Sequence, residues 1–151
     1  MAPNESADGI AVRPAKMGDA PDVARLLEQL GYPCTRDEAA DRIVTVLGDP
    51  RQMLLLAERD GHACGLISLN NTYSVAHGAE LARITALIVG DDCQREGIGK
   101  RLLREVEVLS RQAGISRIEV TSGSQRHGAA AFYRGCGYSE GSLRFVKLLG
   151  D

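Results

Sequence analysis

The sequence lacks any paired cysteine or histidine motif. Its four cysteines and three histidines are scattered, and no two cysteines stand in a C-x-x-C pair. That spacing argues against a zinc knuckle and against a disulfide framework, so we expect reduced thiols, a cytoplasmic protein and no metal site. These residues are Cys34, Cys64, Cys93, Cys136, His62, His77 and His127.

A strong excess of charge and a long apolar run are also missing. Eighteen Lys and Arg stand against 20 Asp and Glu, so no overall field attracts nucleic acid or a membrane surface. The longest apolar runs, 53–57 and 86–89, are far shorter than the ~20 residues of a membrane-spanning helix. Residues 1–9 are polar and lack the apolar core of a signal peptide. We expect a disordered tail over 1–9, then one domain over 10–151 that binds neither nucleic acid nor membrane.

Strand and helix patterns fill the rest of the chain. Alternating or continuous apolar patterns predict strands at 10–14, 53–59, 62–69, 80–89 and 116–122, and a last strand or hairpin at 138–149. Helical spacing predicts helices over 19–30, 35–47, 98–113 and 128–134, with a polar loop at 70–78. Thr35 and Glu38 have capping-box spacing, and Asp60-Gly61 suits a tight hairpin turn.

The order of these elements is β-α-α-β-β-β-α-β-α-β, which predicts a mixed α/β sheet in a single domain. The continuous apolar run at the end of 80–89 is typical of a central strand buried on both faces. A helix separates this strand from the one at 116–122. That connection implies a parallel pair joined by a right-handed crossover.

Residues 93–103, CQREGIGKRLL, place two glycines and three cations at the start of a predicted helix. Cations there are unfavourable unless an anion from outside binds, because the helix dipole is already positive at that end. Glycine allows close approach of the backbone, and a helix start offers unpaired N–H groups. A P-loop does not fit, because Gln94 and Arg101 stand at two of its required positions. A dinucleotide fingerprint does not fit either, because Leu102 replaces its third glycine.

A third phosphate-binding pattern, Q/R-x-x-G-x-G/A, matches residues 94–99 at every position. About 35 residues downstream, AAAFYRGCGY at 129–138 is similar to A-x-x-F-Y-x-x-x-G-F/Y. In these two motifs the chain resembles the GNAT superfamily of acyl-CoA-dependent N-acyltransferases, best over 81–138. The resemblance implies a central mixed sheet flanked by helices, with two parallel central strands that diverge at the cofactor site. It also implies N-acetyltransferase activity with acetyl-CoA as the cosubstrate.

The same resemblance implies where the cofactor binds. The backbone of the strand end would hold the pantetheine arm, and the loop and helix start would hold the pyrophosphate. Arg126, which stands where the superfamily often has Asn, and Arg134 are further cofactor candidates. The expected cofactor-binding residues are Leu87, Ile88, Val89, Gln94, Arg95, Glu96, Gly97, Ile98, Gly99, Lys100, Arg126 and Arg134.

Acyl transfer from a thioester to an amine needs a neutral amine, a stabilised oxyanion and a proton for the departing thiolate. The Val89 N–H is the expected oxyanion donor. Tyr133 is the candidate acid, because a phenol with a pKa near ~10 stays protonated at neutral pH; the alternative is that it only packs its helix. Histone-type relatives often carry a Glu base where Arg83 stands here. Glu80 and His77 are the candidate bases in its place, each acting through a water; the alternative for both is a surface or loop role.

We therefore expect direct attack by a primary amine in a ternary complex, without a cysteine acyl-enzyme. The amine would belong to a small metabolite, an antibiotic-like compound or a protein N-terminus, and residues 19–47 and 70–78 would wall its site. One alternative is a non-catalytic acyl-CoA-binding or sensing module, and another is a generic nucleotide-binding domain. A homodimer is expected only by analogy with relatives. The sequence leaves the acceptor, the acyl chain preference, the general base and the oligomeric state open.

Overall fold

The structure is a computed structural model that describes residues 4–5, 9–94, 96–121, 128–141 and 144–150. The chain forms two compact units, residues 1–119 and residues 120–151. The sheet up to Glu119 and the three longer helices of the described residues belong to the first unit, and helix α4 belongs to the second.

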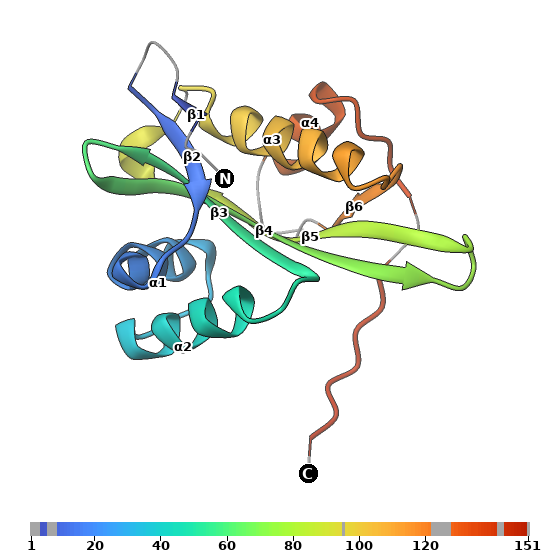
Figure 1. The fold of residues 1–151 in the computed structure, drawn as a ribbon, viewed down its shortest axis with the longest axis horizontal. Helices are drawn as coiled ribbons and strands as arrows, with labels where there is room; N and C mark the ends of the chain where they lie inside the picture. Colours follow the sequence, from blue (N-terminus) through green and yellow to red (C-terminus); the bar gives the residue numbers. More distant parts are fainter. Residues whose placement is uncertain (1–3, 6–8, 95, 122–127, 142–143, 151) are drawn as a thin grey trace. The chain divides into compact units, whose positions relative to one another are not determined.

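A sheet with the strand order β1-β2-β3-β4-β5-β6 forms the framework (Figure 1). The pairs from β1 to β5 are antiparallel. Helix α3 connects β5 to the neighbouring β6, and a crossover helix between neighbouring strands makes them parallel, so the sheet is mixed as predicted. The strands are β1 (Asn4–Glu5), β2 (Ala11–Pro14), β3 (Gln52–Arg59), β4 (His62–Ser74), β5 (Ala79–Val89) and β6 (Ile118–Val120).

Helices cover both faces of this sheet. Helices α1 (Ala20–Leu30) and α2 (Arg36–Leu47) lie on one face, and α3 (Ile98–Gln112) lies on the other (Figure 1). Two short 3-10 helices, η1 (Met17–Asp19) and η2 (Asp91–Cys93), precede α1 and α3. The core between α1, α2 and the sheet is closed by fully buried side chains from both layers, among them Leu26, Ile43, Leu56 and Leu66.

Two local signals in the sequence are confirmed. Thr35 caps α2, because its Oγ1 accepts from the Glu38 N–H at 3.1 Å while the Glu38 carboxylate accepts from the Thr35 N–H at 2.9 Å. Asp60 and Gly61 turn the β3–β4 hairpin with φ of 52° and 81°. Positive φ at both central residues is the geometry of the tight turn that matches strand twist.

Three segments differ in secondary structure from the prediction. Residues 4–5 form β1, which pairs with Ala11 and Val12, where the sequence predicted a disordered tail. The predicted loop at 70–78 is mostly strand, because β4 and β5 stay paired as far as Ser74 and Ala79 and make the polar stretch a long hairpin. Among the described residues of 138–150 none is in a strand, although the pattern alternates, and apolar side chains such as Phe145 are 88% exposed.

A close contact fixes where α3 starts. A Cβ on Gly65 of β4 would lie 3.0 Å from Ile98 Cγ2 and 3.2 Å from Leu102 Cδ1. Glycine at this position therefore lets the first turns of α3 lie against β4. Within the described ranges, no helix is long and apolar enough to cross a membrane.

Helix α4 (Ala129–Gly135) is the main element of the second unit. Gly128, with φ of 80°, precedes it, and Cys136 follows it. Tyr133 is half-buried here and contacts two other rings: its centroid lies 5.2 Å from Phe132 and 5.8 Å from Tyr138. The short helix predicted at 128–134 is thus present, one residue later at each end.

Candidate active site

The carboxyl end of β5 is shaped by a bulge. Ser68 of β4 faces Ala86 and Leu69 faces Ile84, so Thr85 is the extra residue. Its Oγ1 donates to Ser68 Oγ at 2.8 Å, which holds the bulge in place. A bulge bends its strand and increases the local twist. Residues 86–89 therefore leave the direction of the first half of β5.

Strand β6 accompanies only the first part of β5. The Ala82 N–H donates to the Arg117 C=O at 2.9 Å, which places the start of β6 opposite the first half of β5. Because β6 is three residues long and β5 is eleven, residues 87–89 extend past its end. The Gly90 N–H points to Cys64 C=O of β4, at 2.7 Å. Successive N–H groups alternate in direction, so the Val89 N–H points to the edge away from β4.

Two glutamine side chains hold this strand end. Gln29 of α1 donates through Nε2 to the Val89 C=O at 2.9 Å and accepts through Oε1 from the Asp91 N–H at 3.0 Å. Gln94 donates through Nε2 to the same Val89 C=O at 2.7 Å. The predicted cofactor residue Gln94 thus uses its side chain within the protein. Gln29 was missed, because its role depends on a partner 60 residues away.

The glycine motif forms a helix start without a side-chain cap. Gly97 is the N-cap residue of α3, in the left-handed conformation with φ of 75° and ψ of 13°. Only glycine adopts that conformation without strain. The first turn of α3 contains no acidic residue. The N–H groups of residues 98–100 have no partner within the helix, and this end of the dipole is positive, so the site suits an anion.

Arg59 of β3 neutralises the charge of the Glu96 carboxylate. Arg59 donates to its two carboxylate oxygens at 2.6 and 2.8 Å. The hydrogen bond from Arg59 lowers the pKa of Glu96, so the carboxylate stays ionised and paired. Sequence reasoning missed Arg59, because nothing local links it to the motif. Arg59 and Glu96 together therefore carry no net charge.

The remaining predicted cofactor residues occupy different surroundings. Ile98 is buried against β4 and can offer only its backbone, whereas Lys100 is exposed at the start of α3. Arg134, in the second unit, forms an ion pair with Glu140. Arg95 and Arg126 lie outside the described residues.

The structure separates Glu80 from the end of β5. Glu80 is exposed and stands nine residues before Val89 in the same strand, a span of about 30 Å at the rise of an extended chain. His77 lies in the turn before β5, where Nδ1 contacts Ser74 Oγ at 2.8 Å. Arg83 pairs with Glu119 at 3.2 Å. The structure therefore brings neither Glu80 nor His77 to the cluster at residues 87–100.

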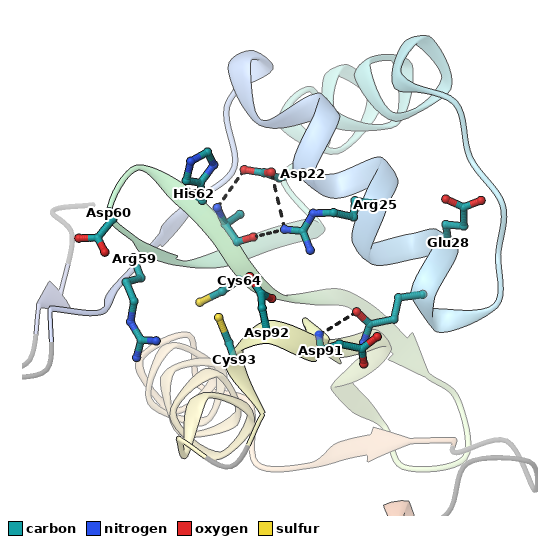
Figure 2. A pocket seen from close by; sticks show the side chains of 12 residues that line it. Asp22, Arg25, Glu28, Arg59, Asp60, His62, Cys64, Asp91, Asp92 and Cys93 are labelled. Atoms are coloured by element: carbon teal, nitrogen blue, oxygen red, sulfur yellow. Dashed lines mark hydrogen bonds and ion pairs between the residues drawn. The ribbon is translucent and has the colours of Figure 1, made fainter.

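A cleft of about 870 Å³ lies beside η2, whose residues form part of its lining (Figure 2). It is bounded by α1, the β3–β4 turn and η2. The Ala63 N–H donates to Asp22 and the Ala63 C=O accepts from Arg25, each at 2.9 Å, so α1 is tied to β4 at its rim. None of the predicted cofactor residues that the structure describes lines the cleft. Its lining includes Cys64, Asp91, Asp92 and Cys93.

The described residues contain no group of three or more His, Cys, Asp or Glu placed to hold a metal ion.

Comparison with known proteins agrees with this geometry. The model of the acetyltransferase (GNAT) family matches residues 21–138. An aminoalkylphosphonate N-acetyltransferase of Salmonella typhimurium is 32% identical over 124 residues, which cover 82% of this chain and 78% of the relative. A GNAT family acetyltransferase of Staphylococcus aureus superposes with a TM-score of 0.81 at 24% identity, over 93% of this chain and 99% of the other. Glucosamine-6-phosphate N-acetyltransferase of Arabidopsis thaliana gives 0.80 at 16% identity, over 93% and 99%. The predicted fold is confirmed, and the chain belongs to the acetyltransferase (GNAT) family.

Proposed function

We propose that the protein transfers the acetyl group of acetyl-CoA to a primary amine. Membership of the family supports acyltransferase activity. The observation that carries the cofactor assignment is the start of α3, where Gly97 opens a fifteen-residue helix with no acidic residue in its first turn. Three backbone N–H groups and the positive end of the dipole suit the diphosphate of coenzyme A.

The exposed edge of β5 is proposed to hold the pantetheine arm. Residues 87–89 extend past β6, and the Val89 N–H points to that edge. An extended ligand can pair with such an edge as an added strand does. Gln29 and Gln94 hold the Val89 C=O, which restrains the backbone next to the Val89 N–H; that N–H is proposed to donate to the thioester oxygen. Acetyl-CoA supplies the activated acyl group when bound.

Tyr133 is proposed to give its proton to the departing thiolate. It lies in the motif at 129–138 that resembles the second signature of the superfamily, and it is half-buried among rings. Because Glu80 is about 30 Å from Val89 along β5, we propose no carboxylate base there. The amine then enters in its neutral form and attacks directly.

The acceptor is proposed to be a primary amine of a small molecule. The relative from Salmonella typhimurium, at 32% identity, is named for aminoalkylphosphonates, which makes these compounds the first to test. Aminoglycosides, sugar amines and peptide N-termini complete the panel.

The decisive experiment measures thiol release from acetyl-CoA in the presence of each amine, after calorimetry has measured acetyl-CoA binding. Micromolar binding and amine-dependent thiol release are expected. Binding without thiol release from any amine would instead indicate a non-catalytic acyl-CoA-binding module. No heat with acetyl-CoA or free coenzyme A, on protein shown to be folded, would contradict the cofactor assignment itself.

Gly97→Ala is expected to weaken acetyl-CoA binding about tenfold, because a side chain at φ of 75° is strained by about 1–2 kcal/mol and relief of that strain turns the first N–H groups away. Gly114→Ala is the matched control: Gly114 lies just after α3 with φ of 80°, and a Cβ meets nothing within 4 Å at either glycine. Both variants should lose similar stability, and only Gly97→Ala should raise the Kd measured by calorimetry. Equal Kd values for both would contradict the assignment.

A further inference from the structure

Cys64 of β4 and Cys93 of η2 lie side by side, although 29 positions separate them in the sequence. Figure 2 shows their sulfur atoms pointing toward one another at the cleft. Both side chains line the same cleft, and each thiol affects the pKa of the other. Both thiols are free, and neither is used in the proposed transfer reaction.

Gly90 holds the two cysteines in this arrangement. Its N–H donates to the Cys64 C=O at 2.7 Å, and its C=O accepts from the Cys93 N–H at 2.9 Å. A Cβ on Gly90 would lie 2.8 Å from Asp92 Oδ1 and 3.3 Å from the Cys64 oxygen, so a larger residue would disturb the contact. Two cysteines whose backbones are both bonded to one glycine, with their sulfurs side by side, can form a disulfide without a large rearrangement of the chain.

The two thiols differ in their surroundings. Burial raises the pKa of Cys64 to about 12, and the neighbouring Cys93 adds to this effect. Burial and the nearby Asp92 carboxylate also raise the pKa of Cys93, but Cys64 and Arg59 act in the opposite direction and reduce the shift. Cys93 is therefore the better site for a thiolate, and Cys64 is placed to resolve a modified Cys93. Each residue is only 4–5% exposed, so the oxidant must be small.

We propose that Cys64 and Cys93 form a redox-active pair that hydrogen peroxide converts into a disulfide, which ties η2 to β4. The Cys93 thiolate attacks one peroxide oxygen, the O–O bond breaks, and the released hydroxide takes up the thiol proton and leaves as water. Cys93 is then a sulfenic acid. The Cys64 sulfur loses its proton and attacks the sulfenic sulfur; the S–S bond forms, the S–O bond breaks, and a second water leaves. The thiols lose two electrons, which reduce the peroxide.

The disulfide would act on the segment that follows Cys93. An S–S bond of about 2.05 Å is much shorter than the contact distance of two non-bonded sulfur atoms, so η2 must move toward β4. Gln94 follows directly and holds the Val89 C=O at 2.7 Å. On the proposed function, on which this step rests, oxidation should weaken acetyl-CoA binding about tenfold, and dithiothreitol should restore it.

The test treats the folded protein with hydrogen peroxide and then blocks free thiols before mass spectrometry. The expected result is two fewer blocked thiols than in the untreated protein, and a peptide that links Cys64 to Cys93 and is about 2 Da lighter than the sum of its two reduced peptides. Cys64→Ser should abolish the linked peptide, whereas Cys34→Ser, a cysteine outside the pair, should leave it intact. If Cys64→Ser does not fold, peptide mapping of the peroxide-treated protein without substitutions still shows whether Cys64 and Cys93 are linked. Over-oxidised Cys93 without a link to Cys64, or a different pairing, would overturn the proposal.

Calorimetry with acetyl-CoA on the reduced and oxidised protein then tests the coupling. Equal Kd values in the presence of the mapped disulfide would overturn the link to the cofactor site. If the reduced protein does not bind acetyl-CoA at all, the proposed function fails, while the mass measurement still decides whether the disulfide forms. The two failures are therefore distinguishable.

Discussion

Tyr133→Phe is expected to lower kcat about 100-fold while acetyl-CoA affinity stays within about twofold, because a positioned acid contributes about 10²–10⁴ to the rate. The change removes only the hydroxyl group. The ring can keep its contacts with Phe132 and Tyr138, at centroid distances of 5.2 and 5.8 Å, so α4 should fold as before. Steady-state thiol release at saturating amine gives kcat, and calorimetry gives the affinity.

Tyr138→Phe is the matched control, since it removes the same group from the neighbouring ring in the same unit of the chain. Its kcat should stay within about threefold of the unmodified protein, because Tyr138 is given no part in proton transfer. An equal loss in both variants would indicate packing of the aromatic cluster. Unchanged turnover of Tyr133→Phe would remove this phenol from the mechanism.

Elements with local signals could be predicted from the sequence. The Thr35 capping box, the Asp60-Gly61 turn and the helix start at Gly97 each depend on residues within four positions of one another, and all three are in the structure. The parallel connection through α3 followed from element order. These features need no knowledge of distant partners, which is why spacing was enough.

Features that depend on distant partners could not be predicted. Arg59 reaches Glu96 across 37 positions, and Gln29 reaches Val89 across 60. Glu80 was a candidate because it shares a strand with Val89. An extended strand rises about 3.3 Å per residue, however, so residues nine positions apart lie far from one another. The alternating pattern at 138–149 predicted a strand, yet a strand also needs a partner, which the sequence of the segment does not specify.

The electrostatics of the site also become clear only with the fold. In the sequence, Glu96 stands among the cations of the motif. In the structure Arg59 takes both of its carboxylate oxygens, so the pair is neutral. Lys100 is exposed at the start of α3, where its charge adds to the dipole. On the proposed function, the diphosphate of coenzyme A would offset the charge of Lys100 and the positive end of the helix dipole.

Asp19→Ala is expected to lower the free energy of unfolding by about 3 kcal/mol, because removal of one partner leaves a buried charge uncompensated. Arg13 and Asp19 are each 7% exposed, and the guanidinium donates to both Asp19 oxygens at 2.8 Å. Glu58, at 2.7 Å, offsets only part of the loss. Urea denaturation at pH 7 measures the change. Glu119→Ala, which removes a more exposed ion pair, is the control and should cost less than about 1 kcal/mol.

The stability difference between the unmodified protein and Asp19→Ala should also depend on pH. Burial raises the pKa of Asp19, but hydrogen bonds from Arg13 and from the Lys16 N–H outweigh it and hold that pKa below its ordinary value. A carboxylate with a lowered pKa stabilises the fold above its unfolded pKa of about 3.9, and this contribution disappears as the pH falls through the folded value. The difference should therefore be constant from pH 7 to about 5 and shrink below about 4. A difference that stays unchanged down to pH 2 would show that Asp19 acts through packing and not through its charge.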